Sequence, residues 1–168
     1  ADAAGVDLGG EGLDDAVVNE LVRSVLLRYM PKADAAGVDL GGEGLDDAVV
    51  VQADAALLEG ILGNLLDNAL RYGKAAQPRV TVTVSREGGD AVLAVIDNGP
   101  GISEQDAGQL RNRWTLGPAG QRLGEGTGLG LAIVSRYAEL LDARFSLDPA
   151  GAGPGLKASV RFKLASSF

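Results

Sequence analysis

Single helices alternate with short strands along this chain, and that order constrains the fold more than any other feature of the sequence. Apolar spacing of about 3.6 residues predicts three helices, over residues 19–30, 55–72 and 128–141. Alternating apolar residues predict strands over 37–40, 48–53, 79–85, 91–96, 144–147 and 156–164. We therefore expect an α/β (α+β) two-layer sandwich, with a mixed, mostly antiparallel sheet and about three helices on one face.

Local residues mark where these elements begin and end. Asn19 is expected to cap the first helix, and Pro31 to end it. Asp54 is expected to cap the second helix, with Gly73 as its stop. The segment 87–90 reads as the turn of a hairpin between two strands.

The composition excludes several classes of function. The chain has 168 residues, enough for one domain, and a net charge of −8 with no basic run longer than two residues, so nucleic acid is not an expected partner. It contains no Cys and no His, which excludes disulfides, imidazole catalysis and any histidine that could accept a phosphoryl group. It begins with Ala rather than Met, so we expect a fragment of a longer protein.

One segment occurs twice without a single change: residues 1–18 recur at 33–50. Structural repeats drift in sequence and come in threes or more, so a perfect pair indicates a recent duplication, a sequence artefact or an extra strand rather than a module. The second copy leads directly into the helix at 55–72 and is the copy expected to belong to the domain. We therefore place the domain at residues 19–168 and treat 1–18 as a duplicated addition.

The second helix carries a polar row beside its apolar stripe. Asn64 and Asn68 are four residues apart and share one face, and Arg71 continues the same edge. An asparagine oxygen is a hard, neutral ligand suited to Mg²⁺, and a guanidinium suits phosphate. A partly exposed polar edge without a ligand is the alternative interpretation.

Asp97 follows a buried strand and opens the sequence Asp-Asn-Gly-Pro-Gly-Ile. A turn at the end of a strand explains this pattern equally well. A carboxylate at the bottom of an apolar pocket could instead accept a hydrogen bond from the exocyclic amine of adenine, whereas guanine presents a carbonyl there. Gly99 and Gly101 would let the backbone approach a flat base closely.

Glycines at every second position, Gly124 to Gly130, open the third helix. Backbone N–H groups at such a helix start can hold phosphate. The spacing fits neither a dinucleotide-binding fingerprint nor a Walker P-loop, because no strand precedes it and no Gly-Lys-Ser/Thr ends it.

Together, three segments resemble the ATP-binding catalytic (HATPase) domain of bacterial sensor histidine kinases, in the GHKL ATPase superfamily. NLLDNALRYG at 64–73 is similar to the N box, DNGPGI at 97–102 to the G1 box, and GEGTGLGLAIV at 124–134 to the G2 box. The resemblance covers about residues 19–164. It implies the Bergerat ATP-binding fold, with ATP and Mg²⁺ as ligands and residues 103–123 as the ATP lid.

The resemblance also implies roles for individual residues. Asn68 corresponds to the Mg²⁺ ligand, and Asn64 and Arg71 to the catalytic positions that contact the phosphates. Tyr72 would lie against adenine, and Asp97 would accept its amine. The other nucleotide-binding positions are glycines and their neighbours in the two glycine boxes: Gly99, Gly101, Ile102, Gly126, Thr127, Gly128, Leu129 and Gly130.

The reaction implied is transfer of the γ-phosphoryl group of ATP to a histidine on a separate dimerisation domain. Asn64 stands where hydrolytic relatives carry a Glu, and an amide cannot take a proton from water, so slow hydrolysis is expected. An anti-sigma-type protein-serine kinase and a non-enzymatic ATP-sensing module are the alternatives.

The expected partners are the phosphoacceptor and dimerisation helices of the parent kinase and, indirectly, a response regulator. The parent protein is expected to be anchored in the inner membrane, with this domain in the cytoplasm.

The lid departs from the family pattern, because Leu110 to Trp114 stand where a Phe-rich box is usual. Trp114 occupies one of the Phe positions.

Overall fold

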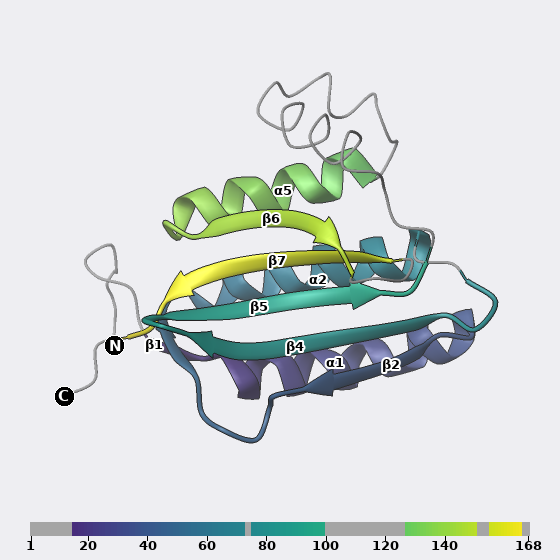
Figure 1. Cartoon of the computed structure of the whole chain (residues 1–168), viewed down its shortest axis with the longest axis horizontal. Coiled ribbons are helices and arrows are strands. Elements are labelled where there is room, and N and C mark those ends of the chain that lie inside the picture. Colours follow the sequence, from purple (N-terminus) through teal and green to yellow (C-terminus); the bar gives the residue numbers. More distant parts are fainter. Residues whose placement is uncertain (1–14, 73–74, 100–126, 151–154, 166–168) are drawn as a thin grey trace.

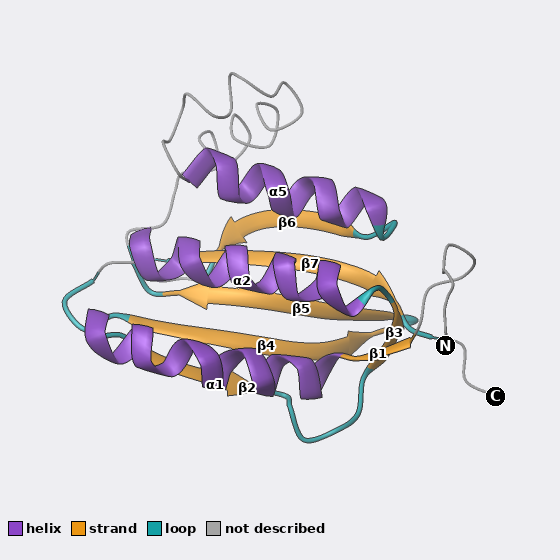
Figure 2. Ribbon diagram, turned by 180° about the vertical axis from the view of Figure 1, so that it is seen from behind, coloured by secondary structure: helices purple, strands orange, loops and turns teal. Residues whose placement is uncertain are grey.

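Three helices cover one face of a five-stranded sheet in the described part of the computed structural model, which comprises residues 15–72, 75–99, 127–150 and 155–165 (Figures 1 and 2). The sheet contains β2 (Asp39–Glu43), β4 (Arg79–Glu87), β5 (Asp90–Asp97), β7 (Leu156–Lys163) and β6 (Arg144–Pro149), in that spatial order. The helices are α1 (Val18–Ala36), α2 (Ala55–Tyr72) and α5 (Thr127–Leu140). The expected two-layer sandwich is confirmed.

The sheet is mixed but mostly antiparallel, as predicted. Only β2 and β4 run parallel, while the pairs β4–β5, β5–β7 and β6–β7 are antiparallel. A second, two-stranded sheet joins β1 (Asp15–Val17) to β3 (Val50–Gln52). The strands expected at 37–40 and 48–53 therefore exist as β2 and β3, but they lie in different sheets.

The core lies between the central strands and α2. Alternate residues of β5, namely Ala91, Leu93 and Val95, face the helices and are buried. The helix offers a fully buried apolar stripe: Leu58, Ile61, Leu62, Leu65 and Leu66. Each such side chain contributes about 1.5–3 kcal/mol on burial, so this contact fixes α2 against the sheet. None of the described helices is both long and apolar enough to cross a bilayer.

The helix α1 continues past Pro31, so the prediction that Pro31 ends it is wrong. Pro31 is exposed, so the carbonyl group that loses its helical N–H partner there can bond to water instead. The following turn is held by the buried Ala33, and the helix ends at Gly37, which adopts a left-handed conformation. Burial of the last turn outweighs the local effect of the proline.

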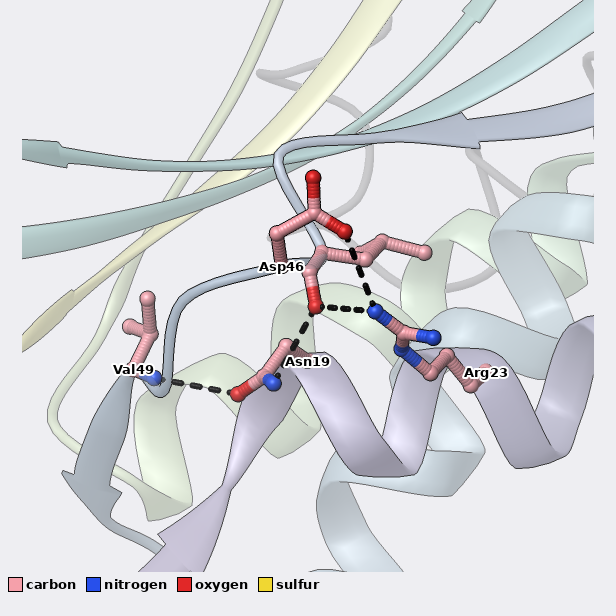
Figure 3. Close-up of polar contacts among 5 residues, drawn as sticks. Asn19, Arg23, Asp46 and Val49 are labelled. Carbon is pink, nitrogen blue, oxygen red and sulfur yellow. Dashed lines mark hydrogen bonds and ion pairs between the residues drawn. The ribbon is translucent and has the colours of Figure 1, made fainter.

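Asn19 does not cap α1, which is a second correction, because Val17 occupies the cap position. The side chain of Asn19 instead bridges to the loop between β2 and β3 (Figure 3). Its oxygen accepts from the N–H of Val49 at 3.0 Å, and its nitrogen donates to the carbonyl of Leu45 at 3.3 Å. Arg23 donates to the same carbonyl at 2.7 Å. This asparagine therefore ties a loop to a helix.

Other local predictions are confirmed. Asp54 caps α2, because its side-chain oxygen accepts from the backbone N–H groups of Ala56 and Leu57 at 2.8 and 3.2 Å. The β4–β5 hairpin turns at residues 87–90, and β6 with β7 forms a second antiparallel pair. Gly73, the expected stop of α2, lies outside the described residues.

Different helix and strand ends lie at the two ends of the molecule. The carboxyl ends of α2 and β5 lie at the same end as the amino end of α5 (Figures 1 and 2). The two-stranded sheet of β1 and β3 lies at the opposite end (Figures 1 and 2). The segments singled out from the sequence thus come together at one end, called here the site end.

Candidate functional site

Asp97 is the last residue of β5, the central strand, and its neighbours in the sheet are Val80 and Leu156. Only 7% of the residue is exposed. One carboxylate oxygen accepts from the N–H of Gly99 at 2.9 Å, which forms the expected turn. Burial raises the pKa of Asp97, and hydrogen bonds from the backbone of Gly99 and Leu156 partly oppose that rise. The site therefore presents a partly desolvated carboxyl group.

Gly155, the residue before β7, lies in close contact with the backbone of Asp97. Its φ of +132° is rare for any residue with a side chain, and a Cβ atom there would collide with the carbonyl oxygen of Asp97. The sequence placed residues 148–155 only between the strands expected at 144–147 and 156–164, and this contact was not predicted; the first of those strands in fact extends to Pro149. The only sequence evidence for it was the glycine immediately before the last strand.

Asn68 lies on the last turns of α2, at the site end. Its side-chain oxygen is buried and finds no hydrogen-bond partner within the described part of the chain. An unpaired buried polar atom costs about 1–3 kcal/mol, so its presence needs an explanation. A neutral amide oxygen is a ligand that Mg²⁺ accepts, with phosphate and water supplying the rest of the shell. The residue fits a magnesium ligand.

Asn64 lies one turn before Asn68 and is half-buried. Its amide nitrogen donates to the carbonyl of Gly60 at 2.7 Å, which holds the amide along the helix. Asn64 therefore has a fixed orientation and no ionisable group that could act as a base. The backbone of Arg71 and Tyr72 forms the end of the same helix.

The packing of α5 on α2 depends on a second glycine that sequence reasoning passed over. The ring of Tyr137 lies over Gly60, and a Cβ atom at Gly60 would be 2.5 Å from the ring carbon Cε2. The absence of a side chain at Gly60 thus lets α5 approach the helix that carries Asn64 and Asn68. The contact sets the separation of two segments that were predicted to share one ligand.

The structure brings most of the predicted site residues to the site end. Thr127, Gly128, Leu129 and Gly130 form the first turn of α5, while Asp97 and Gly99 lie at the end of β5 and in the turn after it. Four other predicted parts lie outside the described residues: Gly101, Ile102, Gly126 and the expected lid at 103–123.

Sequence reasoning also passed over Asn98, the second residue of the turn. Its side chain bonds to two backbone groups of the segment that leads into β4. The residue was read only as part of the Asp-Asn-Gly sequence, and nothing in that sequence shows which distant segment an asparagine side chain will meet.

Comparison with known proteins shows similarity in sequence to one set of proteins and in fold to another. Residues 53–166 match the family described as histidine kinase-, DNA gyrase B- and HSP90-like ATPase. The sensor protein BasS of Escherichia coli (strain K12) is 40% identical over 113 residues, which are 67% of this chain and 30% of BasS. The sensor histidine kinase YcbM of Bacillus subtilis (strain 168) is 32% identical over 131 residues, 77% of this chain and 42% of YcbM.

Solved structures agree on the fold. The catalytic domain of histidine kinase ThkA superposes with a TM-score of 0.74 at 19% identity, covering 91% of this chain and 97% of that one. The mycobacterial sensor histidine kinase MprB gives a TM-score of 0.72 at 23% identity, covering 92% of this chain and 99% of that one. The chain spans less than a third of the length of the first curated relatives it matches. The chain belongs to the histidine kinase-, DNA gyrase B- and HSP90-like ATPase family, as an ATP-binding catalytic domain of the bacterial sensor histidine kinase type.

Proposed function

We propose that this domain binds Mg-ATP at the site end and donates the γ-phosphoryl group to a histidine on a separate dimerisation domain of its parent sensor kinase. The observation that carries the proposal is the buried, unpaired oxygen of Asn68, at the same end of the described part of the molecule as the buried carboxyl group of Asp97. The oxygen of Asn68 suits the Mg²⁺ ion at the phosphate end of Mg-ATP. The carboxyl group of Asp97 suits the amine donor at the adenine end.

Asp97 would select the base. An ionised carboxylate only accepts hydrogen bonds, so it pairs with the exocyclic amine of adenine and repels the carbonyl that guanine presents there. The bond from Gly99 uses one oxygen and orients the carboxyl group. Burial strengthens the discrimination, because a wrong base leaves a desolvated carboxylate unpaired.

Asn68 would hold Mg²⁺, which when bound supplies positive charge to the phosphate oxygens. The backbone N–H groups at the start of α5 and the guanidinium of Arg71 would bind the phosphates from the protein side. Gly99, Gly101, Ile102, Gly126 and the residues Thr127–Gly130 would complete the pocket around the nucleotide. Tyr72 would lie against adenine.

The transfer breaks the bond between the γ-phosphorus and the bridging oxygen of ATP and forms a bond to an imidazole nitrogen. ADP leaves, and the imidazole proton passes to a base beside the acceptor histidine, because this chain contributes no base at Asn64. The chain contains no His, so the acceptor lies outside it. We propose dimerisation helices of the parent kinase as the direct partner, a response regulator as the later acceptor, and a membrane-anchored parent with this domain in the cytoplasm.

Calorimetric titration tests the binding part of the proposal. We expect the wild-type chain to bind ATP more tightly than GTP and to need Mg²⁺ for full affinity. Asp97→Asn should lower ATP affinity by about tenfold to a hundredfold, as expected for a lost hydrogen bond to a charged group. Equal affinity for ATP and GTP in the wild-type chain would contradict the proposal.

A second experiment tests the transfer. The chain is mixed with labelled ATP and a purified phosphoacceptor helix pair, and the acid-labile label on histidine is measured. Label on a serine of a separate protein would favour the anti-sigma-type alternative instead. Steady-state ATP hydrolysis as fast as that of a dedicated ATPase would contradict the role given to Asn64.

A further inference from the structure

Two segments meet beside Asp97, and the side chain of Asn98 joins them. Its oxygen accepts from the backbone N–H of Arg79 at 2.7 Å, and its nitrogen donates to the carbonyl of Gln77 at 2.9 Å. The backbone N–H of Asn98 also donates to the carbonyl of Arg79 at 3.2 Å. Three hydrogen bonds therefore connect the turn after β5 to the segment that leads from α2 into β4.

A surface hollow of about 350 Å³ lies against that segment, lined by Gly37, Asp39, Ala76, Gln77, Pro78 and Arg79. On the side of β2, the N–H of Asp39 donates to the carbonyl of Pro78 at 2.9 Å, and its carboxylate pairs with Arg79 at 3.6 Å across exposed side chains. Residues 75–77 and 79 are exposed, so hydrogen bonds rather than apolar burial hold this segment in position.

The segment and the turn both adjoin the proposed base site. Asp97 immediately precedes Asn98, and residues 75–79 follow the end of α2, where Tyr72 lies. We propose that Asn98 is a positioning residue for adenine recognition, which holds the carboxyl group of Asp97 at a fixed distance from the end of α2. This inference rests on the proposed function, since it assumes that Asp97 reads the base.

The pattern requires an amide. Asparagine offers one acceptor and one donor, and both are used here. An aspartate in its place would keep the acceptor for Arg79 but would turn a second oxygen toward the carbonyl of Gln77, and it would add a negative charge beside Asp97. Alanine would remove both side-chain bonds. Asn98→Asp is therefore expected to displace the turn after β5 from the segment that leads into β4. Asn98→Ala is expected to leave that turn less firmly held to the segment.

The chain contains a matched control at its opposite end. Asn19 makes the same pair of bonds, accepting from the N–H of Val49 and donating to the carbonyl of Leu45. Asn19→Asp and Asn19→Ala remove equivalent hydrogen bonds without touching the site end. A general loss of stability would affect both pairs of variants, whereas a loss of base positioning would affect only the Asn98 variants.

The test measures Kd for ATP and for GTP by calorimetry, well below the Tm of each variant, together with the Tm itself. For Asn98→Asp and Asn98→Ala we expect the preference for ATP over GTP to fall by about tenfold. The Asn19 variants should lower Tm at least as much, because the bond between Asn19 and Val49 is buried whereas both side-chain bonds of Asn98 are exposed. They should keep the wild-type preference for ATP. The variant Asn98→Ser, which retains one small polar group, serves if either larger change prevents folding.

Two outcomes would overturn different parts of the argument. Asn98 variants that lose Tm yet keep the wild-type ratio of ATP to GTP affinity would overturn the positioning role. A wild-type chain that does not prefer ATP would overturn the proposed function itself. The ratio for the wild-type chain therefore separates the failure of one from the failure of the other.

Discussion

Asn19 and Asn68 lie on helices near opposite ends of the molecule, and their amide oxygens have opposite surroundings. The oxygen of Asn19 accepts from the N–H of Val49, and its nitrogen bonds to the loop as well (Figure 3). The oxygen of Asn68 is also buried, but it has no partner in the described part of the chain. The same amino acid is thus satisfied at one end and unsatisfied at the other.

This difference distinguishes buried polar groups that hold the fold together from buried polar groups that are available to a ligand. A buried polar atom that already has a partner within the fold is accounted for by that partner and needs no ligand to explain it. A buried polar atom without a partner lowers stability, and a chain retains it when a ligand supplies the missing interaction. Asp97 lies between these two cases, because burial raises its pKa although the backbone of Gly99 and Leu156 already donates hydrogen bonds to it.

The largest effect is expected from Asn68→Leu, which replaces the unpaired amide with an apolar group of similar size. Affinity for Mg-ATP should fall roughly a hundredfold, by about 2–3 kcal/mol, while the free energy of unfolding stays the same or rises. Calorimetry with and without Mg²⁺ and urea unfolding measure the two quantities. If Asn68→Leu were strongly destabilised and still bound Mg-ATP normally, Asn68 would have a structural role and not a ligand-binding role.

Asn19→Ala should show the opposite pattern. It leaves the N–H of Val49 and the carbonyl of Leu45 without this partner, so the free energy of unfolding should fall by about 1–3 kcal/mol. ATP affinity should be unchanged, because the change lies at the end away from Asp97. Urea unfolding checks the first result and calorimetry the second. A parallel loss of ATP affinity would show that the two ends are coupled.

The third prediction concerns pH and stability. Burial places the pKa of Asp97 in the folded chain above its value in the unfolded chain. The contribution of this group is therefore fully present below the unfolded pKa and is lost as pH rises through the folded pKa. Asp97→Asn, which cannot ionise, should therefore be more stable than wild type at pH 7.

Urea unfolding of both proteins between about pH 4 and pH 7 tests the sign. The advantage of Asp97→Asn should shrink as pH falls through the raised pKa. If Asp97→Asn were less stable than wild type across this range, the carboxylate of Asp97 would stabilise the fold, as the side chain of Asn19 does. The contrast between Asn19 and the site end would then not extend to Asp97.

The smallest effect is expected from deletion of residues 1–14. The carboxyl ends of β5 and α2, which carry Asp97 and Asn68, and the start of α5 all lie at the end of the molecule away from β1, where the described part of the chain begins (Figure 1). ATP affinity should therefore stay within the error of calorimetry. A large loss of affinity on this deletion would show that the first copy of the repeat contributes to the site.

Elements governed by neighbouring residues were predicted well from the sequence. The cap at Asp54, the extent of α2 and the hairpin at 87–90 depend on interactions within a few residues, and the structure shows all three. The spacing of Asn64 and Asn68 likewise follows from the helical period alone. The order of the three boxes added the resemblance to the histidine kinase family, which the comparisons confirm.

Features that depend on distant segments could not be predicted. Pro31 was expected to end α1, but the burial of Ala33 carries the helix onward. Gly155 and Gly60 have their roles only because Asp97 and Tyr137 lie against them. The bonds of Asn98 likewise depend on which segment lies beside it. In the last three cases the deciding contact joins residues far apart in the sequence.

The two copies of the repeat show the limit of local sequence most directly. Asp15-Ala16-Val17-Val18 and Asp47-Ala48-Val49-Val50 are identical, yet the first forms β1 and opens α1, while only the last residue of the second enters a strand. Ala16 is buried and its counterpart Ala48 is exposed. Local preferences are equal in both copies and cannot separate them.

The sequence by itself determined the three boxes, the spacing of their polar residues and the type of most elements, because those depend on the identity and order of neighbouring residues. Tertiary structure alone decided what the identical segments 15–18 and 47–50 became. The N–H of Val18 donates to the carbonyl of Val49 at 2.8 Å, and β1 pairs with β3, so the two copies contact one another in different roles. Burial and hydrogen bonding to distant partners distinguish them, because the chain that follows each copy leads to a different place in the fold.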